Sequence, residues 1–287
     1  ACALLSVCAA PLAAQHAVSS ADLQLTLAQD GSISGFSLAG EAWPLTAGSP
    51  SGLLLRDVAA GGEFVPAGGS VASADGVVTH SGQSDALKLE FEATYRPLPG
   101  AVEVRGFIHD LSAQDRAITV RFSLPIDARG GVWRHDLLTR EAIGESTYSN
   151  VRSTGVGATG NTSAFPWAAV SGPAGEVCLG IPMDHFAVHR LAYGGKAGCF
   201  TLDFDFGLSP LTEAFPSRAD FSLVIYTADT RWGFRSAAAA YYALFPDAFV
   251  RRAEKEGLWM PFTDIAKVQD PEDFNFAFQE GASNIPW

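Results

Sequence analysis

The chain has 287 residues, of which 47% are hydrophobic and 17% are charged. This composition is too apolar for a disordered chain, and the length is sufficient for a sizeable core. Acidic residues outnumber basic residues by 31 to 19, which gives a net charge of −12. A surface of that sign repels phosphate backbones, so nucleic acid is not expected as a partner. No apolar run reaches the ~20 residues that a transmembrane helix needs, so no membrane span is expected.

Residues 1–14 contain no charged side chain, and Leu12-Ala13-Ala14 precedes Gln15. An apolar stretch that ends in small residues is typical of a secretory signal peptide. We therefore expect residues 1–14 to be the remnant of a signal peptide that has lost its basic start, and the protein to be secreted or periplasmic. Two alternatives stay open: Cys8 as the site of a lipid anchor, and a buried N-terminal helix.

Cys178 and Cys199 are the two cysteines that would remain after removal of this segment. An oxidising compartment permits a disulfide between them, and two buried thiols on neighbouring strands fit the sequence equally well. Two cysteines without a CxxC spacing make a weak case for a metal site. No metal and no cofactor is expected.

The first clear strands form a hairpin. The segment LQLTLAQDGSISGFSL places Leu23, Leu25 and Leu27 on one face, turns at Asp30-Gly31 and continues as a second strand. Alternation of apolar and polar residues on both sides of an Asp-Gly pair is a strong hairpin signal.

Period-two alternation continues to about residue 226, with a looser region near 127–163. In ALKLEFEATY the apolar residues alternate with polar ones, as in a half-buried antiparallel strand; they are Leu87, Leu89, Phe91 and Ala93. At least ten strands follow one another with no helix between them. We expect two antiparallel sheets that pack face to face.

The pattern changes after residue 228. Residues 232–257 carry four consecutive alanines and aromatic residues at helical spacing, and Pro246 interrupts them. This predicts two helical pieces. The apolar runs LWMPF (258–262) and FNFAFQEG (274–281) then enclose a polar stretch. A strand after a helix, followed by a loop and another strand, is how a β/α domain begins.

The succession of several segments carries a resemblance. They are DRAITVRFSLPID (115–127), FPWAAV (165–170), GEVCLGIPMDHFAVHRLAY (175–193), ADFSLVIYTADTRWGFRSAAAAYY (219–242) and FPDAFVRRAEKEGLWMPF (245–262). This order resembles the N-terminal galactose-mutarotase-like β-supersandwich domain of large bacterial (β/α)8-barrel glycoside-hydrolase-like proteins, and the resemblance covers roughly residues 20–287.

The resemblance implies a mainly β fold, an antiparallel two-sheet supersandwich followed by a helical linker and the truncated start of a β/α barrel. After the signal-peptide remnant, the expected parts are the supersandwich at 20–228, the linker at 229–257 and the barrel start at 258–287. The implied function is that of a non-catalytic accessory domain of an exported glycoside hydrolase. Its partners would be the missing C-terminal catalytic barrel, whose cleft it shapes, and carbohydrate. The segment alone is expected to be inactive.

Four residues are candidates for substrate binding in the complete protein. Catalytic residues of such barrels lie at the C-terminal ends of the strands. If LWMPF is the first barrel strand, Trp259 and Asp264 lie at or near that end, and Glu280 ends the second strand. Trp133, in the loose region, is a candidate for stacking on a sugar ring. No catalytic carboxylate pair is expected, because such pairs normally come from later strands.

Two other functions remain in play. An independent carbohydrate-binding module predicts an exposed aromatic platform, with Trp133 in an open groove, whereas an exposed apolar patch beside 229–262 would indicate a missing domain.

A mutarotase-type epimerase needs a histidine pair and a glutamate in a central cleft. The Asn-x-x-His-type segment of that family is not present, since Asn150 and Asn161 have no adjacent histidine. His185 and His189 are four residues apart, which on a strand separates them by roughly 13 Å, too far to share one metal ion. The loose region also holds Glu141 and Glu145 with His135 and Asp136, a candidate group for acid–base work, for interdomain or ligand contact, or for an ordinary solvated loop.

Overall fold

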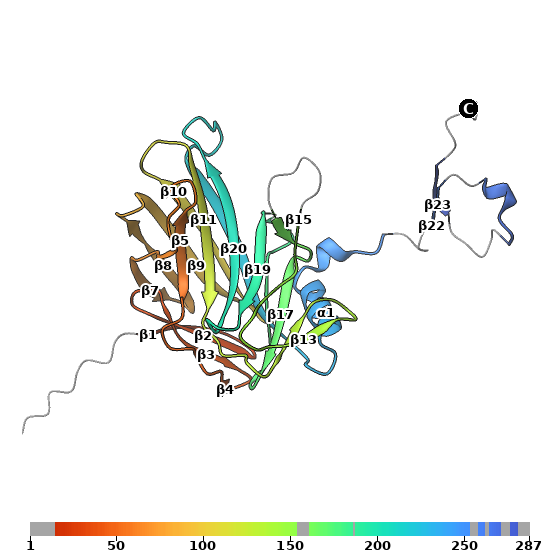
Figure 1. Cartoon of the computed structure of the whole chain (residues 1–287), viewed down its shortest axis with the longest axis horizontal. Coiled ribbons are helices and arrows are strands. Elements are labelled where there is room, and N and C mark those ends of the chain that lie inside the picture. The colour runs from red at the N-terminus through yellow and green to blue at the C-terminus, as the bar shows by residue number, and fades with distance from the viewer. Residues whose placement is uncertain are drawn as a thin grey trace, which may run out of the picture. The chain divides into compact units, whose positions relative to one another are not determined.

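The computed structural model describes residues 15–153, 161–185, 187–252, 258–261, 264–270 and 276–280; the expected signal-peptide remnant lies outside them. The chain divides into two compact units, Ala1–Phe245 and Pro246–Trp287. Antiparallel strands make up most of the first unit (Figure 1). No helix in the described part of the chain is long and apolar enough to cross a lipid bilayer.

Two large sheets form the body of the first unit. The larger has the order β13-β12-β17-β18-β21-β10-β9-β8-β7, and its strands are β13 (Arg140–Ala142), β12 (Val132–Arg134), β17 (Trp167–Gly172), β18 (Gly175–Gly180), β21 (Arg218–Ala228), β10 (Ala101–Asp110), β9 (Leu89–Leu98), β8 (Val77–Ser84) and β7 (Ser70–Ala74). The other has the order β14-β19-β20-β11-β5-β6, and its strands are β14 (Thr147–Ser149), β19 (His189–Gly194), β20 (Cys199–Leu208), β11 (Arg116–Leu124), β5 (Gly52–Asp57) and β6 (Val65–Pro66).

Smaller sheets complete the first unit. One has the order β1-β2-β3-β4, with β1 (Gln15–Ser20), β2 (Leu23–Ala28), β3 (Ile33–Leu38) and β4 (Glu41–Ala42). The other pairs β15 (Val151–Ser153) with β16 (Asn161–Ser163). The region near 127–163 that looked loose in the sequence therefore carries the short strands β12 to β16.

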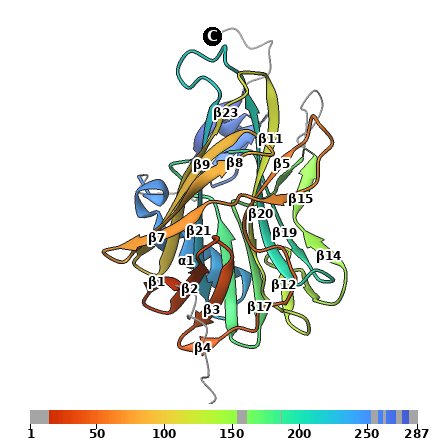
Figure 2. The ribbon, with the colours of Figure 1, turned by 90° about the vertical axis from the view of Figure 1, so that its left-hand side faces the viewer.

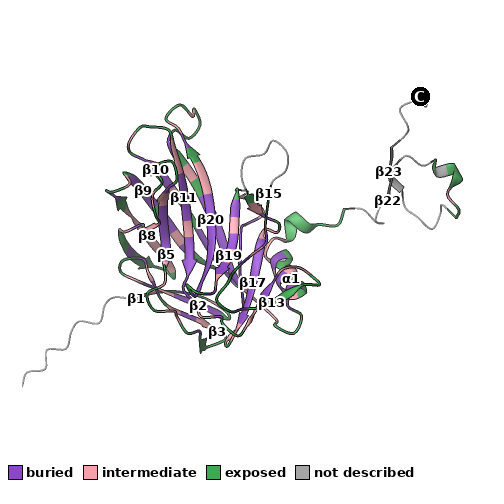
Figure 3. Ribbon diagram, viewed as in Figure 1, coloured by how far each residue is buried: buried purple, intermediate pink, exposed green. Residues whose placement is uncertain are grey.

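The core lies between the two large sheets. Figure 2 shows β9 and β21 on one side and β20 and β19 on the other, and Figure 3 shows buried residues along the strands of both sheets. The rings of Phe204 in β20 and Phe221 in β21 lie 5.9 Å apart, so the two sheets are in direct contact. The predicted mainly β fold with facing antiparallel sheets is confirmed.

The predicted hairpin is also confirmed. Leu23, Leu25 and Leu27 are buried on one face of β2, and β3 pairs with it in antiparallel register. Asp30 holds the turn, because its Oδ1 accepts hydrogen bonds from the Ser32 amide at 3.0 Å and from the Ser32 hydroxyl at 2.6 Å.

The alternation predicted around β9 holds from Leu89 onward, with Leu89, Phe91 and Ala93 all buried. Leu87 departs from it, because this residue lies in the turn before β9 and is only half-buried.

Helix α1 (Phe234–Leu244) covers part of the outer face of the larger sheet. Its Tyr241 hydroxyl donates to the carbonyl of Ile181 at 2.6 Å, and the hydroxyl of Tyr226 in β21 donates to the carbonyl of Ala237 at 3.2 Å. A second apolar cluster around Trp167 fills the space between helix and sheet. The first unit therefore extends past residue 228, where the sequence placed the start of a linker.

The second unit contains η1 (Pro246–Phe249), β22 (Leu258–Pro261), η2 (Ile265–Lys267) and β23 (Phe276–Glu280). The predicted break at Pro246 is confirmed, since α1 ends just before it and η1 begins at it. Strands β22 and β23 pair in parallel, whereas the strand pairs described in the first unit are antiparallel.

Cys178 and Cys199 are both buried free thiols. Burial raises the pKa of each thiol. Of the two arrangements that the sequence left open, the structure shows the reduced one.

Candidate functional site

Trp133 lies in the core. Its side chain in β12 is fully buried, its ring lies 6.0 Å from that of Phe200, and its indole N–H donates to Asn150 Oδ1 at 3.4 Å. A ring in this position has no face open to solvent on which a sugar could stack.

The other three predicted residues lie in the second unit. Trp259 in β22 and Glu280 in β23 are described by their backbone only, and Glu280 pairs with Pro261, so both parallel strands end at the same edge. Asp264 is exposed and accepts a hydrogen bond from the Ala266 amide at 3.0 Å. The arrangement of these three side chains relative to one another stays a prediction.

His185 and His189 contact backbone carbonyl groups. His189 contacts the carbonyl oxygens of Ala187 and Phe165 at 3.1 and 3.2 Å, and His185 contacts that of Asp220 at 3.1 Å. Both are thus occupied by backbone groups.

His135 bridges Glu141 of β13 and Asn150, with its Nε2 at 3.0 Å from Glu141 Oε2 and its Nδ1 at 3.1 Å from Asn150 Oδ1. Within the described residues, no group of three or more His, Cys, Asp or Glu side chains could hold a metal ion.

A polar network covers the outer face of the six-stranded sheet. Because Ile118, Val120 and Phe122 point into the core, the alternate residues of β11 face outward. There Arg121 forms two hydrogen bonds with Asp203 of β20, at 2.6 and 2.8 Å. The guanidinium of Arg121 also lies 3.8 Å from the centre of the Phe64 ring.

The network continues to Asp205, which pairs with Arg190 of β19 and accepts a hydrogen bond from the Thr119 hydroxyl at 2.7 Å. Burial raises the pKa of Asp205, but the hydrogen bonds from Arg190 and Thr119 outweigh it and hold this pKa below its usual value. The carboxylate therefore remains ionised at neutral pH and fully engaged. It is poorly suited to act as a general acid.

Two hollows of about 520 and 390 Å³ lie on this face and share four lining residues, namely Val188, Asp205, Phe206 and Gly207. Charged pairs beside an aromatic ring can bind a ligand rich in hydroxyl groups. We refer to this surface as the sheet groove.

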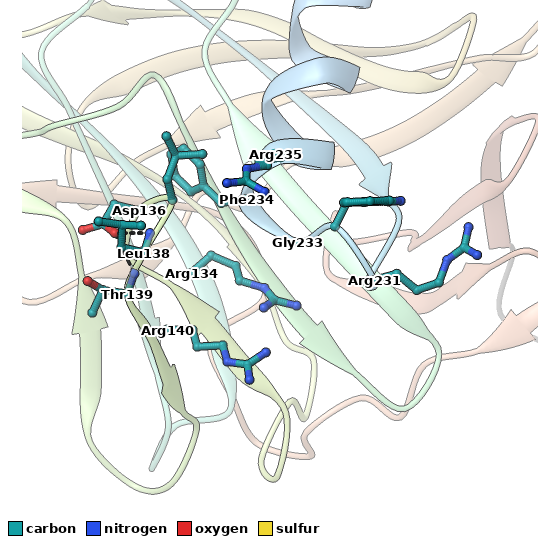
Figure 4. A pocket seen from close by; sticks show the side chains of 11 residues that line it. Arg134, Asp136, Leu138, Thr139, Arg140, Arg231, Gly233, Phe234 and Arg235 are labelled. Atoms are coloured by element: carbon teal, nitrogen blue, oxygen red, sulfur yellow. Dashed lines mark hydrogen bonds between the residues drawn. The ribbon is translucent and has the colours of Figure 1, made fainter.

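A further pocket of about 360 Å³ lies between β12, β13 and the turn into α1 (Figure 4). Arginines dominate its lining: Arg134, Arg140, Arg231 and Arg235. The sequence analysis missed this pocket. The available signal was the presence of two arginines in each of the short segments WRHDLLTR and TRWGFR, in a chain with only 19 basic residues.

Solved structures provide the comparison for the fold. The chain matches a glycoside hydrolase family 36 (GH36) α-galactosidase, AgaA of Geobacillus stearothermophilus, with a TM-score of 0.53 and 9% identity. The fold is the supersandwich predicted from the sequence. The match covers 86% of this chain and 45% of the α-galactosidase, so this chain spans less than half of that enzyme. At such low identity the likeness extends to the fold alone.

Smaller proteins also match over nearly their whole length. A putative aldose 1-epimerase from Escherichia coli K12 has a TM-score of 0.48 and 10% identity, over 75% of this chain and 99% of its own. A galactose mutarotase-like protein from Lactobacillus casei ATCC 334 has a TM-score of 0.43 and 12% identity, over 74% and 99%. No family model matches this chain, and no curated protein does.

Proposed function

We propose that this chain is the non-catalytic accessory supersandwich of an exported glycoside hydrolase, and that β22 and β23 begin its catalytic (β/α)8 barrel. One observation carries this proposal: 86% of the chain has its structural counterpart within 45% of an α-galactosidase. The same fold thus forms less than half of a carbohydrate-cleaving enzyme, which leaves room for a catalytic domain beside it.

The second unit supports the proposal. Parallel strands need a crossover connection, and a (β/α)8 barrel consists of parallel strands joined by such connections. Strands β22 and β23 are parallel and separated in the sequence by a connection that includes η2. This pairing is the arrangement expected of the first two strands of a barrel.

Exposed apolar side chains between the sandwich and β22 also support it. Phe249 and Val250 are adjacent and both exposed in the second unit, and Tyr242 is exposed near the end of the first. Neighbouring exposed apolar residues often mark a surface that another domain covers. These residues lie within 229–262, the segment beside which a missing domain was expected, and they support such a domain.

The sheet groove favours a second candidate function, an independent carbohydrate-binding module. Its paired charges and Phe206 offer hydrogen bonds and an apolar face to a sugar. The described lining holds no unengaged carboxylate beside a histidine, so the groove supports binding better than epimerase chemistry.

The experiment uses this chain and the polypeptide encoded directly downstream of it. We expect the chain alone to leave aryl glycosides intact, and the mixture to form a complex in analytical ultracentrifugation and to cleave a glycoside. Val250→Ser should weaken the complex, whereas Val58→Ser, at an exposed valine in the first unit, should not. Cleavage by the chain alone, or equal effects of the two variants, would contradict the proposal.

A further inference from the structure

The arginine-lined pocket combines side chains from two distant parts of the sequence. We call it the arginine pocket; it holds Arg134 and Arg140 from β12 and β13, and Arg231 and Arg235 from the turn into α1 and its first residues (Figure 4). Among the lining residues that the structure describes, Asp136 carries the single carboxylate. The lining is therefore basic, although the chain has a net charge of −12.

Two of these arginines lack a partner. Arg134 pairs with Glu176 at 2.9 Å, and Arg231 pairs with Asp229 at 2.7 Å. Within the described residues, the guanidinium groups of Arg140 and Arg235 form neither an ion pair nor a hydrogen bond. No carboxylate in the described part of the chain pairs with either of these two side chains.

The carboxylate of Asp136 contributes its negative charge to the same lining, but among the described residues it forms no ion pair with Arg140 or Arg235. Its Oδ1 accepts the amides of Leu138 and Thr139, both at 2.7 Å, and thereby closes the turn between β12 and β13. This carboxylate is committed to holding the hairpin. Counting Asp136, Glu176 and Asp229 against the four arginines leaves one net positive charge at the pocket.

The register of the hairpin adds a second, independent observation. Arg134 and Arg140 are directly opposite each other on β12 and β13, and Figure 4 shows their guanidinium groups extended to the same side. Like charges in directly opposed positions destabilise a sheet. Glu176 already offsets the charge of Arg134, so an anion beside Arg140 would offset the other member of the pair.

A buried donor points to the same conclusion. Arg134 is only 9% exposed, and its Nε is buried without a hydrogen-bond partner, as is Glu176 Oε1. An unsatisfied buried polar group costs free energy, most of all on a charged side chain. This pocket therefore holds both unpaired charges at its surface and an unsatisfied donor on its buried arginine.

We propose that the arginine pocket binds the carboxylate of an acidic saccharide of the uronate class. The planar guanidinium matches a carboxylate with two parallel hydrogen bonds, and Arg140 and Arg235 supply this interaction. Trp232 lies in the same lining with 63% of its surface exposed and offers its ring to the apolar face of the sugar. The volume of about 360 Å³ lies within the usual range for small-ligand sites.

The saccharide part of this inference rests on the proposed function, whereas the preference for an anion rests on the arginines alone. Isothermal titration calorimetry of the whole chain tests both parts with three probes: tri-galacturonate, the neutral trisaccharide of galactose, and inorganic phosphate. We expect tri-galacturonate to bind at least tenfold more tightly than either of the others. Its affinity should fall as the salt concentration rises, because the interaction is ionic.

Variants locate the binding. Arg140→Gln and Arg235→Gln should each weaken tri-galacturonate binding about tenfold, since each removes a charged hydrogen bond. Trp232→Ala should weaken it several-fold. Arg96→Gln is the matched control, because Arg96 is an exposed arginine of β9 outside the pocket, and it should leave the affinity unchanged. Circular dichroism of each variant shows that the fold is retained.

Several results would overturn the inference. Equal binding of phosphate would reduce the pocket to a general anion site, and equal binding of the neutral trisaccharide would remove the role of the carboxylate. Equal binding of a poly-glutamate peptide would make the pocket a protein-docking surface, and no binding would leave it without a ligand. Complex formation with the downstream polypeptide is measured separately, so failure here is distinguishable from failure of the proposed function.

Discussion

Arg116 at the start of β11 connects two carboxylates that the fold has largely removed from water. Its Nη1 donates to Asp110 Oδ1 at 2.7 Å and its Nη2 donates to Asp57 Oδ2 at 2.8 Å. The Asp110 side chain is fully buried, and that of Asp57 is only 12% exposed. Because β5 and β11 belong to the six-stranded sheet and β10 to the larger one, this cluster joins the two sheets at one end.

Replacing Arg116 tests this cluster. Arg116→Met leaves two poorly solvated carboxylates without their cation, and breaking a buried pair in this way costs about 3–5 kcal/mol. We expect that loss in the free energy of unfolding, measured with urea at pH 7. Arg96→Met, at an exposed arginine without a described partner, should change it by less than about 0.5 kcal/mol. Similar losses in the two variants would show that the cluster is not stabilising.

The same cluster predicts a pH dependence. Burial raises the pKa of Asp57, but the hydrogen bonds from the Ala60 amide and from Arg116 outweigh it and hold this pKa below its usual value. A carboxyl group with a lowered folded-state pKa contributes stability above its unfolded pKa of ~3.9 and loses that contribution as the pH falls. The stability of the wild type should therefore fall more steeply below about pH 4 than that of Arg116→Met.

The positions of individual side chains were harder to predict from the sequence than the strands and helices that carry them. Trp133 was a candidate ligand residue because its surroundings lacked a long alternating run, yet strands of three residues suffice to place it in the core. The arginine pocket joins residues about a hundred positions apart, and only the pairing of β12 with β17 and the docking of α1 bring them together. The spacing of residues within one segment cannot predict that side chains so far apart in the sequence will line the same pocket.

At the scale of single elements, β10 shows how closely neighbouring strands pack. A Cβ atom on Gly106 would lie 2.4 Å from the Glu92 carbonyl oxygen and 2.6 Å from Cζ of Phe221. The first of these atoms belongs to the backbone of β9 and cannot move without disturbing the sheet. Gly106 thus allows the three strands β9, β10 and β21 to approach one another.

Gly106→Ala should lower the free energy of unfolding by about 1–3 kcal/mol, the usual cost of overpacking. Gly207→Ala is the matched control, because Gly207 also lies in a long strand but has no atom within 4 Å of the added methyl group. That control should be neutral or slightly stabilising, since alanine restricts the unfolded chain. Thermal and urea unfolding of both variants measure the difference; equal stabilities would refute the close approach.

Elements were predicted better than single residues, for physical reasons. The strands of the hairpin and β9 have one buried face, so alternation in the sequence reports their structure directly. Proline at 246 ends a helix by geometry alone. The pairing order of the strands could not be predicted in this way, because β21 joins β10 and β18 through contacts distant in sequence.

At the scale of the whole molecule, the chain divides into two compact units. We therefore expect the first unit to have a thermal stability that does not depend on the second. A chain that ends at residue 252 retains the sandwich together with α1. Its thermal unfolding midpoint, followed by circular dichroism, should lie within about 2 °C of that of the full chain, a shift that corresponds to less than ~1 kcal/mol.

A chain that ends at residue 228 provides the contrast. It lacks α1 and leaves Trp167 and Tyr226 of the outer cluster uncovered, so its midpoint should fall clearly. If truncation at 252 lowers the midpoint as much as truncation at 228, the second unit contributes to the stability of the first, and the division is not an energetic one.

The place of β21 in the larger sheet matters during synthesis of the protein. This strand is the last of the sandwich to leave the ribosome, yet it lies in the interior of the sheet, between β18 and β10. Until residue 228 has emerged, the nascent polypeptide presents two open strand edges and an uncovered apolar layer, which are the usual starting points of aggregation. The sheet therefore cannot be completed until β21 has been translated. Before then, we expect molecular chaperones to bind the open strand edges and the uncovered apolar layer.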